Sequence, residues 1–429
     1  MNASSGHLPV RTALRLPPLG LAAAVAAVAV ATAAALPARA AVILVGPNES
    51  VTRIADAAKL ARDGDTVLIR PGTYKGDVAS WPQKSLEIRG FGGRPVLAAN
   101  GQNAEGKAIW VMLNGNFKVE NIEFRDATVP DGNGAGIRFE QGQLEVRDCI
   151  FENNQNGILT ANFEDAELRV LNSVFSQAPR DTTALHHLLY VGRIKSLVVE
   201  GSRFHQGYQG HLLKSRARSN EIRYNLLVDG QSGSASYELE FPEGGAALVV
   251  GNVISQSADS ANPIVAGYGA EGSRWPENRL LMAHNTLINN GWRPAWFTRA
   301  WASRLPPDTI VVTRNNLTVG LGLFTLALSG EHHGNFALPS GALNPAALDF
   351  NPPAFLRGRV GKPDGAYVDE LTPRAEFAFP VGTNPLAAPA EWMPGAFQST
   401  GIVMRKAAAA EPVTETRPAA REKTPPRKL

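Results

Sequence analysis

The sequence predicts an all-β fold, a parallel β-solenoid that begins with a short helix and ends in an irregular segment. The main evidence is a recurring motif in which a short apolar strand is followed by a turn residue, such as Asn, Asp or Gly, and then by another apolar residue. The motif occurs as VENIEF, VRDCIF, VLNSVF, VEGSRF, RYNLL, VGNVI, AHNTL and RNNL. The last apolar residues of these motifs lie 23 to 33 residues apart, at Phe124, Phe151, Phe175, Phe204, Leu227, Ile254, Leu287 and Leu317. A period of this length, filled by short strands and turns, is typical of stacked β coils. A leucine-rich repeat would instead show leucines at several fixed positions, and a β-propeller needs longer units.

Two segments flank the predicted solenoid. VTRIADAAKLAR places four apolar residues on one helical face, Ile54, Ala57, Leu60 and Ala61. Such a helix would cover the open backbone of the first coil. Beyond residue 330 the period fails, and we expect residues 331–406 to pack irregularly on the solenoid, with Trp392 and Phe397 as anchors. Residues 407–429 are rich in Ala, Pro and charge and lack aromatic residues, so we expect disorder there.

The first forty residues indicate export. Arg11 and Arg15 precede the apolar run LGLAAAVAAVAVATAAAL, and the small residues of ARA end at Ala40. This is the pattern of a signal peptide, so residues 1–40 are expected to be cleaved off. We expect a secreted or periplasmic protein with no membrane span after signal removal and one β-helix domain over residues 41–330.

Composition argues against several kinds of partner and stabilising bond. The chain has 42 Lys and Arg against 39 Asp and Glu, and loss of the signal removes arginines but no acid, so the mature protein is nearly neutral. No long basic surface is expected, which argues against a nucleic acid as partner. The single cysteine, Cys149, cannot form an internal disulfide, and its apolar neighbours in DCIF predict that it is buried. We expect a monomer stabilised by packing.

A second repeated position points to a site. GIRF, GILT, HLLY, HLLK, YELE and PIVA occupy one strand position in successive coils, which lie about 4.8 Å apart in a parallel solenoid. Side chains alternate along a strand, so Tyr190, Lys214 and Glu240 are expected in one outward column. Glu238 falls on the same outward face, and Ala266 is expected to follow in the next coil. The buried alternates are apolar: Leu189, Leu213, Leu239 and Val265.

The charges near this column suit a long anionic polymer with repeating units, such as an acidic polysaccharide. Cleavage of a uronate polymer by β-elimination needs neutralisation of the carboxylate, a base for the adjacent C–H and an acid for the departing oxygen. Lys214 is a candidate base, because the neighbouring guanidinium groups of Arg216 and Arg218 favour its uncharged form. Tyr190 in the adjacent coil is a candidate acid. His211 is a further catalytic candidate, although its position equally fits a core histidine.

The combination of DGDTVLIRPGTY with Asn- and Gly-rich coils resembles the right-handed parallel β-helix superfamily typified by pectate lyases, over roughly residues 42–330. Within it, KSRARSNEIRYN is similar to the Lys-Ser and Asn-x-Ile-x-x-Asn pattern of the polysaccharide lyase family that includes chondroitinase B and alginate lyases. The matching residues are Lys214, Ser215, Asn220, Ile222 and Asn225. The resemblance implies that Lys214 is the base and that calcium, bound by acidic residues, neutralises the substrate carboxylate. Glu238, Glu240 and Glu243 are the candidate calcium ligands, being hard oxygen donors close together. The family's Arg-His-Gly segment has no counterpart in YELEFPEGG.

Other functions use the same residues. Glu238 and Glu240, two apart on one strand, also fit the acid pair of a glycoside hydrolase. A uronate epimerase shares the proton-abstraction step. Without catalysis, the solenoid would bind a polysaccharide or assist its export. The binding residues would include Arg218, together with Trp292 and Arg293 of NNGWRPAWFTRAW. We therefore expect an exported β-helix that acts on an acidic polysaccharide, most simply as a lyase.

Overall fold

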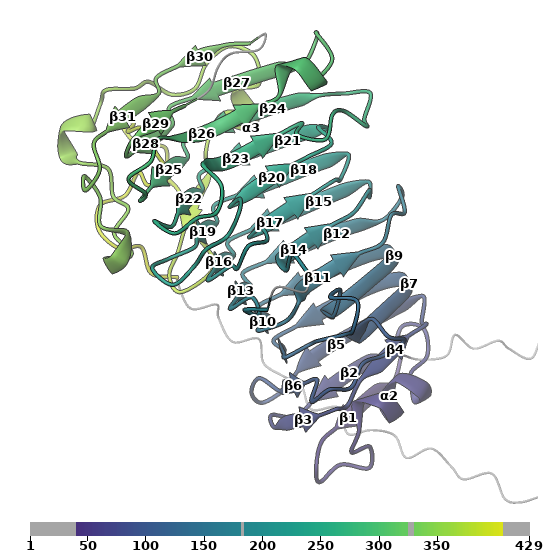
Figure 1. Cartoon of the computed structure of the whole chain (residues 1–429). Helices are drawn as coiled ribbons and strands as arrows, with labels where there is room; N and C mark the ends of the chain where they lie inside the picture. Colours follow the sequence, from purple (N-terminus) through teal and green to yellow (C-terminus); the bar gives the residue numbers. More distant parts are fainter. Residues whose placement is uncertain (1–39, 182–183, 325–329, 406–429) are drawn as a thin grey trace, which may run out of the picture. The chain divides into compact units, whose positions relative to one another are not determined.

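The computed structural model describes residues 40–181, 184–324 and 330–405. These residues form the predicted right-handed parallel β-helix, in which about ten coils stack on one another (Figure 1). Apart from Ala40, the predicted signal peptide lies outside the described residues, as does the predicted disordered tail. In the part of the chain that the structure describes, no helix has the length and apolarity needed to cross a membrane.

Two parallel sheets build the solenoid. The first has eleven strands: β3 (Thr73–Lys75), β6 (Val96–Ala98), β8 (Glu123–Arg125), β10 (Ile150–Glu152), β13 (Val174–Ser176), β16 (Arg203–His205), β19 (Leu226–Val228), β22 (Val253–Gln256), β25 (Thr286–Asn289), β28 (Leu317–Val319) and β31 (Phe336–Leu338). The second has twenty strands in two rows, which are joined by the 13-residue strands β7 (Ala108–Glu120) and β9 (Ala135–Arg147). One row contains β1 (Val42–Val45), β2 (Thr66–Ile69), β5 (Ser85–Gly90), β12 (Glu167–Leu171), β15 (Ser196–Glu200), β18 (Ser219–Arg223), β21 (Ala246–Val250), β24 (Arg279–Ala283), β27 (Ile310–Arg314) and β30 (His332–His333). The other contains β4 (Ala79–Trp81), β11 (Asn156–Thr160), β14 (His187–Val191), β17 (Leu213–Ser215), β20 (Leu239–Phe241), β23 (Ile264–Tyr268), β26 (Ala295–Ala300) and β29 (Gly322–Leu323).

The phenylalanines that end the repeated motif stack inside the solenoid. Phe124, Phe151, Phe175 and Phe204 pair in register on successive coils. Their neighbouring ring centroids lie 4.7 to 5.1 Å apart, and the rings are nearly parallel. Each ring therefore buries the face of the next, which is why an aromatic or large apolar residue recurs once in every coil.

The turns carry a ladder of stacked asparagines. The side-chain oxygen of Asn252 accepts a hydrogen bond of 2.9 Å from the backbone N–H of Asn225, and that of Asn285 accepts one of 3.0 Å from Asn252. These bonds satisfy backbone groups that would otherwise be buried without partners.

Cys149 is buried in the core as predicted, and burial raises the pKa of its thiol to about 12.

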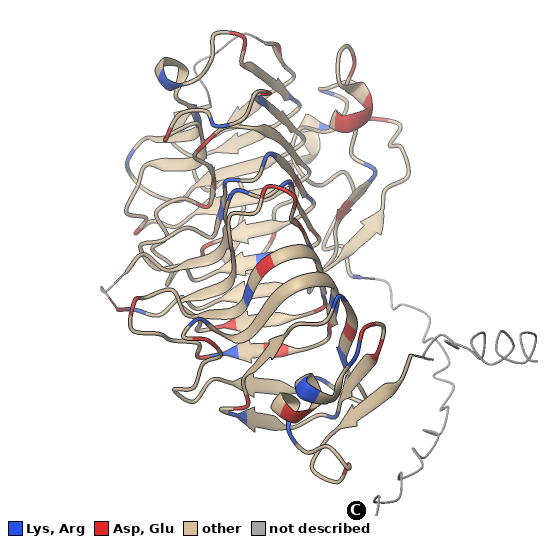
Figure 2. Ribbon diagram, turned by 90° about the vertical axis from the view of Figure 1, so that its right-hand side faces the viewer, with Lys and Arg blue, Asp and Glu red and all other residues tan. Residues whose placement is uncertain are grey.

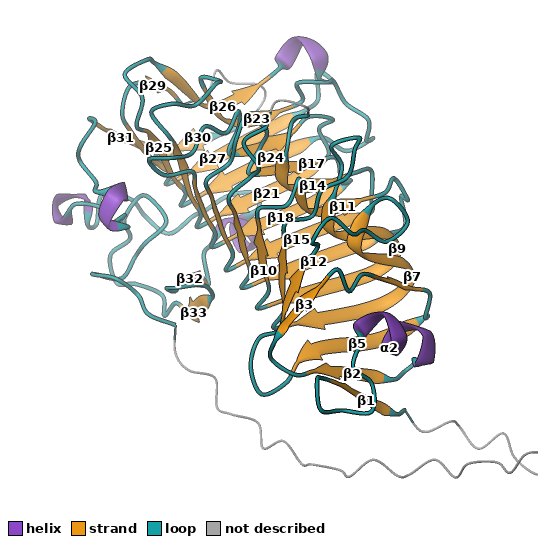
Figure 3. Ribbon diagram, turned by 60° about the horizontal axis from the view of Figure 1, so that its bottom comes forward, coloured by secondary structure: helices purple, strands orange, loops and turns teal. Residues whose placement is uncertain are grey.

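Helix α2 (Ile54–Leu60) lies at the N-terminal end of the stack and packs against β1 and β4 (Figure 3). Ile54 and Ala57 are buried, and the carboxylate of Asp77 accepts hydrogen bonds of 2.7 and 3.0 Å from the backbone N–H groups of Ile54 and Ala55. The predicted helical cap is confirmed. Leu60, expected on the same buried face, is 51% exposed, because the buried face runs through Ile54, Ala57, Ala58 and Ala61 and Leu60 lies beside it.

The C-terminal segment covers outward apolar residues of the eleven-stranded sheet. It contains η2 (Pro345–Ala347), η3 (Ala354–Leu356), α3 (Val368–Leu371) and the antiparallel pair β32 (Ala375–Phe377) and β33 (Thr383–Pro385); a further short helix, η1 (Ala302–Arg304), lies in the solenoid. Leu226 and Leu317 of the sheet form one buried cluster with Phe350 and Phe397 of the segment. Trp392 is buried as well. Parallel pairing continues to β31, beyond the point where the sequence period fails.

Candidate functional site

The predicted outward column is present. Pairing of β14, β17 and β20 places Tyr190 beside Lys214, and Lys214 beside Glu240. In the next coil Glu240 pairs with Gly267, and Ala266 pairs with Leu239. The expectation that Ala266 continues the column is therefore wrong, because the turn from β20 to β21 holds one residue more than the turn from β17 to β18 and shifts the register of the next coil. The column ends at a glycine.

Glu238 does not lie on the outer face, contrary to the expectation. Its side chain is fully buried, and both carboxylate oxygens lack a hydrogen-bond partner among the described residues. The reason is local: β20 begins at Leu239 and the chain bends at Glu238, so the alternation of the strand does not reach back to this residue. Burial, and next the charge of Asp229, raise the pKa of Glu238 well above its usual value, which favours the neutral carboxyl.

Lys214 is held between two carboxylates. Its Nζ lies 3.5 Å from Glu240 Oε2 and 3.4 Å from Glu271 Oε1, and its side chain is 13% exposed. Glu240 Oε2 also lies 2.8 Å from His211 Nε2. Burial works to raise the pKa of Glu240, but the hydrogen bond from His211 and the charge of Lys214 outweigh it and hold that pKa below its usual value. Glu240 is therefore an ionised carboxylate that links the lysine to the histidine.

Arg216 is the centre of the cluster. One of its nitrogens, Nη2, lies 2.7 Å from both carboxylate oxygens of Glu271, and its Nε lies 3.1 Å from Glu243 Oε1. Its third nitrogen donates a hydrogen bond to the phenol oxygen of Tyr190. Arg193 donates two further bonds, of 2.8 and 2.6 Å, to the two oxygens of Glu243. One guanidinium thus connects the phenol to a carboxylate at the open edge of the site.

Sequence reasoning missed Glu271 and Arg193. Glu271 lies in the loop between β23 and β24, which folds back so that its backbone N–H donates to Pro242 at 2.7 Å and Trp275 Nε1 donates to the Arg216 carbonyl at 3.1 Å. Neither residue falls at a repeat position, so the period carries no signal for them.

The charges of the cluster balance. Three cations, Lys214, Arg193 and Arg216, face three carboxylates, Glu240, Glu243 and Glu271. In the view of Figure 2, basic and acidic residues are likewise interspersed along the coils. The basic residues between Gly210 and Asn225 therefore do not form a free positive surface. Glu240, Glu243 and Glu271, which come later in the sequence, neutralise Lys214 and Arg216.

Behind the column of Tyr190, Lys214 and Glu240 lie two buried histidines, His187 and His211, and the ring of Tyr237. His187 Nδ1 accepts a hydrogen bond of 2.9 Å from the backbone N–H of His211, and the two rings lie 4.7 Å apart. The His211 ring stacks on Tyr237 at 4.8 Å, and the His187 ring meets Tyr190 at 5.0 Å. Burial lowers the pKa of both histidines, so both are uncharged near neutral pH. His211 contacts the site through Glu240, whereas His187 packs behind it.

The three predicted calcium ligands are not brought together. Glu238 is sealed in the interior, the oxygens of Glu243 are bonded to Arg193 and Arg216, and Glu240 is bonded to His211 and Lys214. Among the described residues, no group of three His, Cys, Asp or Glu side chains is arranged to hold a metal ion. These residues do not fit a calcium ion, because its oxygen ligands would already be neutralised by protein cations.

The predicted binding residues lie apart from the column. Arg218 is 3.7 Å from Glu164 and stacks on the Trp275 ring, 5.0 Å from its centroid. Trp292 is 77% exposed, and Arg293 lies over its ring. Both line a separate hollow of about 330 Å³ between the turns that follow β22 and β25.

A hollow of about 350 Å³ adjoins the column on the side of the earlier coils. It is lined by Tyr190 itself and by polar residues of preceding coils, among them Lys107, Asn133, Arg138 and Thr160. Lys107 and Arg138 share the carboxylate of Glu140, at 2.8 and 3.2 Å. The column thus opens onto a polar trough that runs across several coils.

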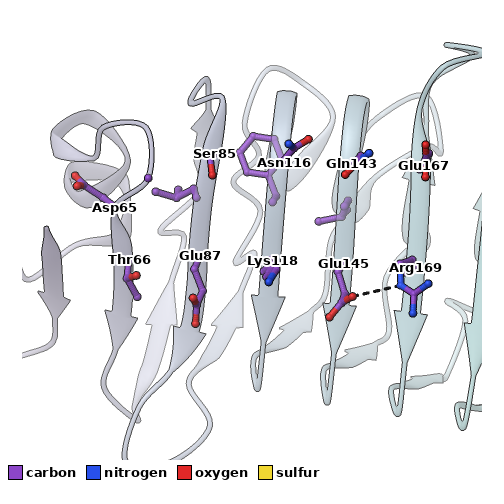
Figure 4. Close-up of a pocket in the computed structure, with 14 residues that line it drawn as sticks. Asp65, Thr66, Ser85, Glu87, Asn116, Lys118, Gln143, Glu145, Glu167 and Arg169 are labelled. Carbon is purple, nitrogen blue, oxygen red and sulfur yellow. Dashed lines mark hydrogen bonds and ion pairs between the residues drawn. The ribbon is translucent and has the colours of Figure 1, made fainter. Parts of the chain in front are cut away.

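A further hollow, of about 320 Å³, lies on β2, β5, β7, β9 and β12 (Figure 4). Its side chains form two rows across the coils, one with Ser85, Asn116, Gln143 and Glu167, the other with Thr66, Glu87, Lys118, Glu145 and Arg169. Charges of opposite sign alternate in the second row, and Glu145 lies 3.3 Å from Arg169. This face has no histidine or tyrosine, so the column of Lys214 is the better site for proton transfer.

Comparisons with known proteins agree with the fold. Neither the sequence models of known families nor the sequences of curated proteins match this chain. Among solved structures, pectate lyase Pel9A aligns with a TM-score of 0.52 at 12% identity, over 83% of this chain and 96% of that one. An alginate lyase from Paenibacillus sp. str. FPU-7 aligns with a TM-score of 0.41 at 13% identity, over 68% and 95%. The alignment with pectate lyase Pel9A shows the fold alone, a parallel β-helix.

Proposed function

We propose that this chain is an exported enzyme that cleaves a uronate-containing polysaccharide by β-elimination. One observation carries the proposal: Tyr190 and Lys214 stand side by side in adjacent coils, and Arg216 donates hydrogen bonds both to the phenol oxygen and to a carboxylate. Elimination requires a base, an acid and a cation that binds the substrate carboxylate, and these residue types supply all three.

Glu271 supports the placement of the substrate carboxylate. Both of its oxygens lie 2.7 Å from Arg216, while its side chain remains 44% exposed. Charge-assisted bonds of this kind are how arginine holds carboxylates in general. In the proposed complex, the uronate carboxylate takes the place of Glu271 on Arg216, and the guanidinium charge acidifies the neighbouring C–H bond. The polymer then continues into the trough beside Tyr190.

Elimination moves two protons. Uncharged Lys214 takes the proton from the acidified carbon, the electron pair of that bond forms a C=C bond, and the neighbouring carbon loses its bond to the glycosidic oxygen. Tyr190 protonates the departing oxygen, and Arg216 balances the charge left on the phenol. Glu240 lies between Lys214 and His211 and positions the lysine at the column, and the proton that the lysine must lose before each turnover passes to solvent. No step is assigned to calcium.

The test is an elimination assay on the mature protein. Purified residues 41–429 are mixed with a panel of acidic polysaccharides, and absorbance of the unsaturated uronate product is followed. A rise supports the proposal and identifies the substrate class. New reducing ends without this absorbance would replace the lyase by a hydrolase, and inverted uronate units in an intact polymer would replace it by an epimerase. Binding without any reaction would assign the protein to polysaccharide binding or export.

A further inference from the structure

A fourth hollow lies on the eleven-stranded sheet, and the proposed reaction does not use it. It has a volume of about 410 Å³ and lies between β16, the turn after β19 and the C-terminal segment. Its lining includes Arg203, His205, Gln206, Ser232, Pro345 and Leu348. A volume in this range is typical of sites for small molecules.

Among the residues that the structure describes, Arg203 in this hollow has no charge partner. It pairs in register with Val174 and Leu226, so no acid stands opposite it on the sheet. Its Nε is buried without a hydrogen-bond partner among the described residues, and burial is the cause that lowers the pKa of Arg203. Arg147, which also points outward, is instead bonded to Glu145 at 3.0 Å. An uncompensated, half-buried charge is unfavourable, and a bound anion would remove that cost.

The surroundings of Arg203 add positive and neutral donors. Arg180 donates a hydrogen bond to the carbonyl of Ser232 and so brings a second guanidinium to the rim. Burial, and next the charge of Arg203, lower the pKa of His205 to about 4, so its imidazole is neutral. The one acid of the lining, Asp229, is fully buried, and its carboxylate accepts bonds of 2.7 and 2.9 Å from two backbone N–H groups. It therefore leaves the charge of Arg203 unmatched.

We propose that this hollow binds one anionic sugar unit. Its carboxylate would pair with Arg203, its hydroxyl groups would bond to Gln206 and Ser232, and its apolar face would rest on Pro345 and Leu348. The hollow lies on a different sheet from Lys214, so this binding does not depend on the proposed elimination. A polymer-degrading enzyme with such a site would hold its acidic polymer at a second point.

The test is thermal unfolding of the mature protein titrated with glucuronate, and in parallel with glucose and with sulfate. We expect a saturable rise in unfolding temperature with glucuronate and none with glucose. Arg203→Gln should raise the dissociation constant at least tenfold, while its unfolding temperature without ligand stays equal or increases, because an unpaired charge has been removed. Arg147→Gln, the matched control, should bind as the wild type does.

Several results would overturn this proposal. They are the absence of saturable glucuronate binding in the wild type, equal binding by Arg203→Gln, equal binding of glucose, and binding of sulfate but not of glucuronate. Loss of binding in Lys214→Ala with retention in Arg203→Gln would place the anion at the column instead. Elimination activity is read separately, so either proposal can fail without the other.

Discussion

Arg216 donates one hydrogen bond to the phenol oxygen of Tyr190 and lies within 2.7 Å of both carboxylate oxygens of Glu271. The same guanidinium therefore contacts the proposed acid and the proposed position of the substrate carboxylate. Because Tyr190 pairs with Lys214 in the sheet, acid and base lie one coil apart, a spacing of about 4.8 Å in stacked strands. This relationship leads to the first two predictions.

Tyr190→Phe removes the proton donor and leaves the ring in place. If Tyr190 protonates the departing oxygen, kcat should fall by roughly 10²- to 10⁴-fold, the range of general acid catalysis. KM should change little, because Arg216 still binds the carboxylate. Steady-state rates of unsaturated product formation measure this, with Tyr367→Phe in the C-terminal segment as the control. A variant with wild-type kcat would remove Tyr190 from the mechanism.

Glu271→Gln removes a charge that competes with the substrate for Arg216. The acidic polymer should then bind more tightly, with KM lowered several-fold and a steeper dependence on salt, because the cluster gains one unit of positive charge. Glu277→Gln, a change in the same loop at a residue bonded to Arg279, is the matched control. An unchanged KM in Glu271→Gln would show that the substrate carboxylate binds elsewhere.

Chelation should leave the rate unchanged. The carboxylates predicted to bind calcium are neutralised by arginine and lysine or sealed in the interior. The elimination assay is run after dialysis against EDTA and again after calcium is added back. Loss of activity that calcium restores would contradict the role given to Arg216.

Glu238 should make folding stability depend on pH. Its pKa is raised in the folded protein above the ordinary value of 4.5, so the folded state holds this proton more tightly than the unfolded chain. The stabilisation is fully present below pH 4.5 and is lost as pH rises toward the folded pKa, by about 1.4 kcal/mol per pH unit from this group. Glu238→Gln removes the titrating group and should flatten that part of the profile.

Denaturant unfolding at a series of pH values measures this difference. The exposed Glu221→Gln serves as the control and should keep the wild-type slope. Asp229 also titrates with a raised pKa, to about 6, mainly because of burial, so a slope from that residue remains in both variants. Parallel profiles for the wild type and Glu238→Gln would show that the buried carboxyl is not held neutral.

The sequence repeat correctly predicted the positions that recur from coil to coil. Strand alternation and coil spacing were enough to place Tyr190, Lys214 and Glu240 in one column, because register is set by which residues are buried. The same reasoning failed at Glu238, where the chain bends before the strand begins, and at Ala266, where a connection of different length shifts the register by one residue.

The repeat could not predict the site residues that loops contribute. Glu271 reaches Arg216 across 55 residues of sequence through a loop whose path is set by Trp275 and a backbone bond, and no period marks either residue. For the same reason the period did not indicate that Glu271 and Arg193 complete a charge-balanced cluster around Lys214 and Arg216. The calcium hypothesis depended on carboxylates near one another in sequence, and the fold directs them to different partners.

The central claim is that Lys214 abstracts a proton from a uronate. The most direct measurement is the rate of unsaturated uronate formation by the wild type and by Lys214→Ala, on the polysaccharide that the wild type degrades. We predict a loss of about 10³-fold or more in the variant, within the range reported for loss of a general base, with an unchanged unfolding temperature. An equal rate in a folded Lys214→Ala would contradict the account.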